Sequence, residues 1–134
     1  MRHLRLETSR KEEFLNITGK IQALVRESGL KSGLVIIFCP HTTCGLTINE
    51  QADPDVQADI LTTLRKIVPD TLPYAHGEGN SPAHIKASLM GSSLMVMVEN
   101  GELLLGTWQG IFLCEFDGPR SRKVWVKLIE SRTE

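Results

Sequence analysis

A chain of 134 residues with 41% hydrophobic and 23% charged residues has the length and composition of one folded domain. Its formal net charge of −1 provides no broad positive field, which excludes a general nucleic-acid or membrane-surface binder. The apolar runs are far shorter than the ~18 residues that span a bilayer, and the basic residues 1–5 have no apolar stretch behind them, so we expect a single domain over residues 1–134 with neither membrane span nor signal peptide.

The cysteines bear on the compartment. There are three, an odd number, and none forms a CxxC pair, which argues against a disulfide framework and for a reducing environment. We therefore expect a cytoplasmic protein. Cys39 and Cys114 lie in apolar runs typical of a core, whereas Cys44 lies close to His41.

In the first half of the chain, apolar patterning predicts short strands around one helix. The strands are expected at residues 4–7, 14–17, 33–39 and 45–49. The helix is expected to begin at Thr18, as a capping residue, and to end at Gly29.

The second half begins with a helix that has clear local signals. Asp53 suits the N-cap, Pro54 suits the first helical position, and Pro69 stops the helix. A polar loop follows, and a short helix is expected from Ser81 to Gly91. Further strands are expected at residues 93–98, 103–105, 108–116 and 123–129, with a type I′ turn at residues 100–101. We predict an α+β fold: a β-rich, sandwich-like domain of two packed sheets with two longer helices and one short helix.

Three of the four histidines lie in polar, turn-rich sequence. His41 follows a predicted buried strand, while His76 and His84 flank a glycine-rich connection. Neutral imidazole is a common metal ligand, so the three could form one metal site with an open position. The alternative is three separate surface histidines, because their spacing matches no compact ligand motif.

Other residues suggest acid–base work or phosphate binding. Glu50 lies just past a strand end with no obvious structural duty, which makes it the better candidate base, whereas Asp53 is more simply a cap. Arg120 lies in a Gly-Pro turn and could clamp phosphate, or it could lie at a solvated hairpin tip. Cys44 could be a nucleophile paired with His41, but an inert cysteine is the favoured interpretation. Trp108 is more simply a core residue than a stacking platform.

Several segments, taken together and in order, resemble the YjbQ-like family over nearly the whole length of the chain. The matching segments are His41-Thr42-Thr43, Leu46-Thr47-Ile48-Asn49-Glu50, Asp53-Pro54, Pro82-Ala83-His84-Ile85-Lys86, Gly106-Thr107-Trp108-Gln109-Gly110 and Gly118-Pro119-Arg120. The resemblance implies a compact β-rich α+β subunit, usually a homotrimer, with a histidine-rich site that holds a metal or an anion. It also implies a weak thiamine-phosphate synthase activity.

The resulting hypothesis is an enzyme that joins a pyrimidine diphosphate to a thiazole phosphate and releases pyrophosphate, as the resemblance implies. His41, His76 and His84 are the expected metal ligands, zinc being the expected metal and magnesium the alternative. Glu50 and Arg120 are the expected catalytic residues. A metal-dependent hydrolase and a non-catalytic metal- or phosphometabolite-binding protein remain open. The expected partners are a phosphorylated small molecule and two further copies of the chain. The resemblance implies the number three, and residues 103–105 and 111–113, which are apolar on both faces, give a reason to associate.

Overall fold

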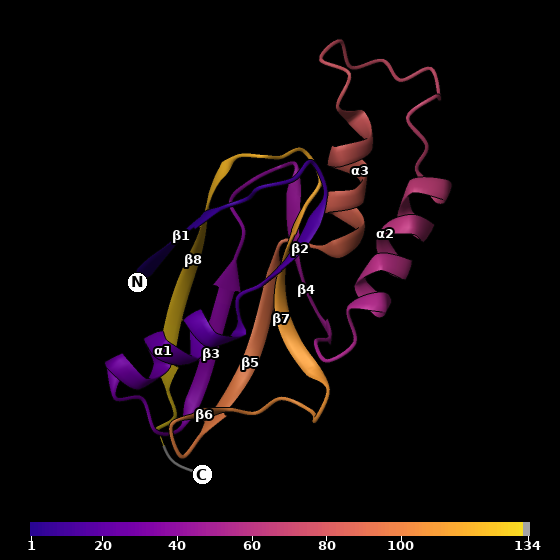
Figure 1. Cartoon of the computed structure of the whole chain (residues 1–134). Helices are drawn as coiled ribbons and strands as arrows, with labels where there is room; N and C mark the ends of the chain where they lie inside the picture. Colours follow the sequence, from indigo (N-terminus) through magenta and orange to yellow (C-terminus); the bar gives the residue numbers. More distant parts are fainter. Residues whose placement is uncertain (133–134) are drawn as a thin grey trace.

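The computed structural model describes residues 1–132, and it confirms the α+β fold with two sheets and three helices (Figure 1). The strands are β1 (Arg2–Glu7), β2 (Glu13–Asn16), β3 (Gly33–Phe38), β4 (Cys44–Glu50), β5 (Ser93–Glu99), β6 (Glu102–Leu103), β7 (Gln109–Glu115) and β8 (Ser121–Glu130). The helices are α1 (Thr18–Ser28), α2 (Pro54–Ile67) and α3 (Ser81–Met90). Within residues 1–132, no helix is long and apolar enough to cross a membrane.

Both sheets are antiparallel. The larger has the order β1-β8-β3-β5-β6 and the smaller the order β2-β7-β4. The two sheets pack face to face and enclose the main core, to which α1 adds Ile21 and Val25. On the other side of the smaller sheet lie α2 and α3, and the long connection between them extends beyond their ends (Figure 1).

Strand β7 is buried on both faces by its own chain. Ile111 and Leu113 belong to the core between the sheets, whereas Phe112 and Cys114 pack in a second cluster with α2 and α3. The continuous apolar run at 111–113 therefore needs no partner subunit to cover it.

Local sequence signals predicted most of the helix and turn boundaries. The Asp53 side chain accepts a hydrogen bond from the Asp55 amide at 2.9 Å, as a capping residue should, and α2 ends before Pro69. Asn100 and Gly101 have φ values of 52° and 77°, as a type I′ turn requires. Thr18, however, does not cap α1: it is the first helical residue, and its amide donates to Asn16 Oδ1 at 3.0 Å.

Glycine sets how closely α3 approaches the smaller sheet. A Cβ on Gly45 would lie 2.8 Å from the carbonyl oxygen of Gly91, which is closer than packed atoms tolerate. Leu46 donates its amide to the same oxygen at 2.9 Å. The end of α3 is thereby held against the beginning of β4, next to the loop that joins β3 to β4.

Candidate functional site

A polar hollow of about 430 Å³ opens where three connections meet. The β3–β4 loop supplies residues 40–43, the β7–β8 turn supplies Asp117 and Arg120, and the start of β8 supplies Arg122. The connection before α3 and the first turn of α3 supply the remaining lining residues, which are His76, Glu78, Asn80 and His84. The hollow thus brings together the three histidines and the arginine that the sequence singled out.

A buried ion pair forms the frame of this hollow. Arg122 Nε lies 2.8 Å from Glu115 Oε1, and both side chains are almost wholly buried. Arg122 also donates to Thr43 Oγ1 at 2.7 Å, while Glu115 accepts from Thr8 Oγ1 at 2.8 Å. Thr8 Oγ1 in turn accepts the amide of Arg120 at 2.8 Å. The pair therefore connects the β3–β4 loop to the β7–β8 turn.

The protonation of this pair follows from its partners. Burial disfavours the carboxylate of Glu115, but hydrogen bonds from Arg122 and Thr8 outweigh it and hold the pKa of Glu115 below its ordinary 4.5. Burial likewise disfavours the guanidinium of Arg122, yet the bond to Glu115 raises its pKa. Both groups are charged at neutral pH.

His41 is already hydrogen-bonded within the chain. Its Nε2 accepts the backbone amide of Lys123 at 3.0 Å, so the proton of the neutral ring is on Nδ1. Burial and the nearby positive charge of Arg122 lower the pKa of His41 below 6.5. At neutral pH the ring is therefore an uncharged N–H donor, and its free lone pair is committed to the backbone.

His76 and His84 lie together. Their ring centroids are 5.4 Å apart and the rings are nearly perpendicular, at 86°. His76 Nε2 also lies 3.9 Å from Glu78 Oε2. Two rings at this separation could share one ligand, but residues 1–132 contain no group of three His, Cys, Asp or Glu side chains arranged to hold a metal ion. The three-histidine metal site therefore stays a prediction.

Arg120 is held at the rim of the hollow by Asp117. Its Nε donates to the Asp117 carbonyl at 2.7 Å and its Nη2 to Asp117 Oδ2 at 2.9 Å, which leaves other guanidinium N–H groups for a ligand. Asp117 Oδ2 also accepts from Asn80 Nδ2 at 3.0 Å. Burial opposes the charge on Asp117, but these bonds to Asn80 and Arg120 prevail and lower its pKa.

Asn80 lies at the beginning of α3. Its Oδ1 is buried and accepts no hydrogen bond from any group within residues 1–132, and no side chain caps the helix. Because Asn80, His84 and Arg120 all line the hollow, the positive end of the helix dipole lies at it.

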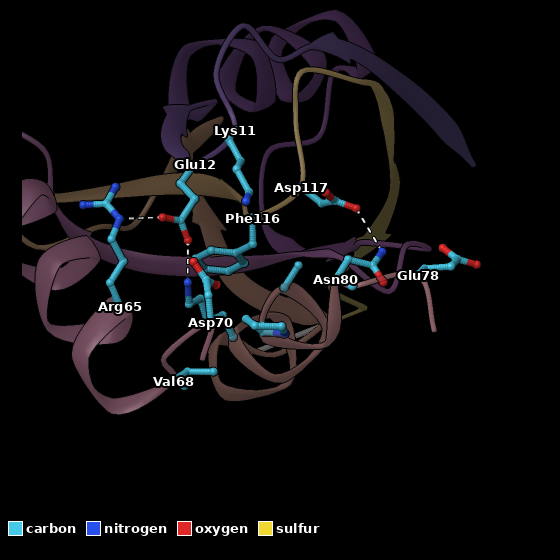
Figure 2. A pocket seen from close by; sticks show the side chains of 13 residues that line it. Lys11, Glu12, Arg65, Val68, Asp70, Glu78, Asn80, Phe116 and Asp117 are labelled. Carbon is cyan, nitrogen blue, oxygen red and sulfur yellow. Dashed lines mark hydrogen bonds and ion pairs between the residues drawn. The ribbon is translucent and has the colours of Figure 1, made fainter. Parts of the chain in front are cut away.

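Figure 2 shows a second hollow, of about 290 Å³, which shares lining residues with the first. Glu78, Asn80 and Asp117 line both. In the second hollow one carboxylate is shared by two cations, because Glu12 lies 2.6 Å from Arg65 Nε and 2.7 Å from Lys86 Nζ, so this group keeps a net positive charge. Burial disfavours the charge on Glu12, yet its pKa is lowered by these two cations.

Other candidates lie away from the first hollow. Glu50 is the last residue of β4, whose first residue is next to the hollow, so the length of the strand separates them by about 20 Å. Its carboxylate accepts the amide of Asp53 at 3.0 Å. Trp108 is 62% exposed, so the prediction of a core tryptophan is wrong. Cys44 is buried and its Sγ lies 3.3 Å from Cys39 Sγ; a nucleophile paired with His41 was the less favoured interpretation of the sequence.

Sequence reasoning missed Glu115 and Asn80. A glutamate inside the otherwise apolar run of β7 was the available signal, because a buried charge needs a partner. For Asn80 there was no comparable signal, since its role depends on contact with Asp117 in another connection.

These features belong to a small α+β domain with a polar hollow. The chain matches the family model "UPF0047 protein YjbQ-like" over residues 2–131. It is 47% identical to the UPF0047 protein YugU of Bacillus subtilis, covering 96% of this chain and 98% of that protein. A crystal structure of a YjbQ/UPF0047-family protein from Clostridium acetobutylicum superposes with a TM-score of 0.94 at 56% identity, covering 96% of this chain and 100% of the other.

A second solved structure agrees. A conserved hypothetical protein of Thermus thermophilus has a TM-score of 0.90 at 48% identity, over 96% of this chain and 100% of that one. The chain therefore belongs to the YjbQ-like UPF0047 family, as the segments quoted above indicated.

Proposed function

We propose that the first hollow binds a phosphorylated small molecule and that the chain is a weak transferase of the thiamine-phosphate synthase type. The observation that carries the proposal is the meeting of Arg120, His41 and the beginning of α3 at one hollow. Arginine donates to phosphate through a planar fork, and the amides at a helix N-terminus favour an anion. A neutral His41 adds an N–H donor without adding charge.

Two adjoining hollows support a reaction that joins two substrates. Glu78, Asn80 and Asp117 stand between them, so molecules bound in each would be neighbours. In such a reaction the pyrimidine diphosphate would place its diphosphate at Arg120, where N–H donors stabilise the charge that develops as pyrophosphate leaves. The thiazole phosphate would occupy the other hollow. The reaction itself is inferred from the family resemblance, and the hollows supply only the phosphate chemistry.

A divalent metal, zinc first and magnesium second, remains part of the proposal. The residues fit it incompletely: His76 and His84 are close together, but the lone pair of His41 is bonded to the amide of Lys123. Elemental analysis of the purified chain, with His76→Ala and His84→Ala beside it, tests for an ion.

Glu50 does not belong to the first hollow of its own chain. It is too far along β4 to touch a ligand in the first hollow of its own chain. An acid–base role for Glu50 therefore depends on a neighbouring copy.

We also propose a cytoplasmic homotrimer. The outer face of the larger sheet carries exposed apolar side chains, among them Phe38, Met95, Met97 and Ile129. Trp125 stacks on Phe38 with centroids 5.7 Å apart, and within residues 1–132 no group accepts its buried Nε1–H. A continuous apolar surface of this kind is typical of an interface. This face, rather than β7, is the surface we expect the neighbouring subunits to cover.

Calorimetric titration with pyrophosphate tests the phosphate site. We expect Arg120→Lys to weaken binding roughly tenfold, about 1.4 kcal/mol, because lysine lacks the planar fork. Arg26→Lys is the matched control, since Arg26 is also an exposed arginine paired with a carboxylate, at 3.3 Å from Glu102. Equal affinity of the Arg120 variant and wild type would contradict the proposal.

Turnover then separates the functions. Pyrophosphate release that requires both the pyrimidine diphosphate and the thiazole phosphate supports the transferase. Release from the diphosphate with water alone identifies a hydrolase instead. Tight binding with no turnover identifies a binding protein.

A further inference from the structure

Two buried thiols face each other beneath the loop that carries His41. Cys39 follows β3 and Cys44 begins β4, and their Sγ atoms are 3.3 Å apart. Each side chain belongs to a residue that is only 2% exposed. A disulfide bond is about 2.05 Å long, so the sulfurs need to approach by only about 1 Å to be joined.

The backbone holds both thiols in this register. Cys39 donates its amide to Ser92 at 2.7 Å, and Cys39 Sγ lies 3.4 Å from the carbonyl oxygen of Cys44. Gly45, the next residue, is fixed by its close approach to Gly91. The short distance between the sulfurs is therefore maintained by the strands on either side of the loop.

The third cysteine is separate. Cys114 packs with α2 and α3 in the second cluster, whereas Cys39 and Cys44 lie in the core between the sheets. The chain therefore contains one close thiol pair and one isolated thiol, all three in the reduced state.

A small oxidant has a route to the pair. Cys44 lines a hollow of about 480 Å³ together with His41, Thr42 and His84. These three neighbours also line the ligand hollow. Hydrogen peroxide is little larger than water and fits such a space.

We propose that Cys39 and Cys44 form an oxidation site for hydrogen peroxide or a small hydroperoxide. In the first step, one sulfur attacks a peroxide oxygen: an S–O bond forms, the O–O bond breaks, and water (or an alcohol, from a hydroperoxide) leaves. The second sulfur then displaces the oxygen, so that an S–S bond forms, the S–O bond breaks and water leaves. Two thiols are oxidised and one peroxide is reduced, and a dithiol reverses the change.

The disulfide would act on the ligand hollow through the loop it closes. All four residues between the cysteines, Pro40 to Thr43, line that hollow. Drawing the loop ends together shifts His41 and Thr43 relative to Lys123 and Arg122, which bond them. The disulfide should therefore weaken anion binding severalfold. This second part rests on the proposed phosphate site, whereas the oxidation does not.

Peptide mass analysis tests the oxidation on the purified full-length chain. The protein is treated with a small excess of hydrogen peroxide, denatured, alkylated and cut with trypsin. Residues 32–64 contain no lysine or arginine, so both cysteines lie in the peptide that ends at Arg65, and Cys114 lies in another. We expect the 32–65 peptide to lose both alkylation sites and two hydrogens, and to regain the sites after reduction. The Cys114 peptide should stay alkylated.

Variants provide the matched controls. Cys39→Ala and Cys44→Ala should each abolish the intramolecular change, whereas Cys114→Ala should leave it intact. Retention of both alkylated thiols in the wild-type peptide overturns the proposal, and so does a disulfide that joins two chains or includes Cys114. The wild-type measurement is decisive even if a variant fails to fold.

Pyrophosphate titration of reduced and oxidised protein tests the coupling. Weaker binding after oxidation, restored by a dithiol, supports it, and unchanged affinity in a chain shown to be oxidised overturns it. If the reduced chain binds no pyrophosphate, the phosphate site fails, while the peptide result still decides the oxidation site.

Discussion

The ion pair between Glu115 and Arg122 should be the most costly polar contact to break. Glu115→Gln keeps the size of the side chain but removes its charge. One carboxylate oxygen is replaced by an NH2 group, which cannot accept a hydrogen bond. That group would face donors that now bond to the carboxylate, such as the backbone amides of Phe116 and Asp117, each 3.1 Å away. Arg122 would then be left buried without a counter-charge.

The magnitude follows from burial. Glu115 is 0% exposed and Arg122 is 5% exposed, and removing one partner of a buried pair costs about 3–5 kcal/mol. We expect Glu115→Gln to lower the free energy of unfolding by that amount in urea at pH 7. Protein concentration must be held fixed, because the proposed assembly would contribute to apparent stability.

Two companion variants make the test specific. Glu102→Gln breaks an exposed pair with Arg26 and should cost at most about 1 kcal/mol. The double change Glu115→Gln with Arg122→Met removes both charges and should be more stable than Glu115→Gln alone. A loss below about 1 kcal/mol for Glu115→Gln, or a double variant less stable than the single one, would refute the reasoning.

Three further predictions concern pH and assembly. Folding lowers the pKa of Glu115, so the stability that its carboxylate contributes is present above the ordinary pKa of 4.5 and is lost as pH falls through the folded pKa. Wild type should therefore lose more stability in acid than Glu115→Gln, as measured by urea unfolding across that pH range. His41 should titrate below 6.5 by NMR, and the stability gained by keeping it neutral should decline as pH falls from 6.5 toward the folded pKa, a decline that His41→Gln should remove. Met97→Glu, on an exposed apolar face, should reduce the sedimentation mass from three chains toward one, while Glu99→Gln, at the end of the same strand, should not.

The parts of the fold that depend on neighbouring residues were readable from the sequence. The Asp53-Pro54 start of α2 and the Asn100-Gly101 turn each rest on the chemistry of two adjacent residues, and both are confirmed. Thr18 shows the limit of such signals. A threonine at a helix start is a good cap in general, but here Asn16 accepts the amide and the threonine hydroxyl oxygen accepts the amide of Ile111 instead.

The parts that depend on distant residues could not be read. An apolar run shows that β7 is buried but not what covers it, and the second face of β7 packs on helices from elsewhere in the chain. The histidines could be grouped by residue type, yet the partner of His41 Nε2 is the amide of Lys123, 82 residues away. Such a bond leaves no pattern in the sequence.

The family-like segments themselves divide into two groups at opposite ends of β4. His41, His84 and Arg120 lie at its beginning, whereas Glu50 and the exposed Trp108 lie at its far end, where Glu50 pairs with Gln109. A strand of seven residues keeps them about 20 Å apart, and no side chain bridges that length. If both groups serve one ligand, the second must come from another copy of the chain.

The roles of assembly and of Glu50 are therefore one question. In a trimer with shared sites, Glu50→Gln should slow turnover while leaving the free energy of unfolding nearly unchanged, and Met97→Glu should abolish turnover by separating the copies. In a chain that works alone, Met97→Glu should dissociate the subunits without loss of turnover, and Glu50 should matter only as the acceptor of the Asp53 amide. If each chain works alone, mixing two impaired variants restores no activity. If sites are shared between copies, a pair of variants that still associate, such as Glu50→Gln with Arg120→Lys, should regain part of the activity. Some contacts between unlike copies then combine an intact Glu50 with an intact Arg120.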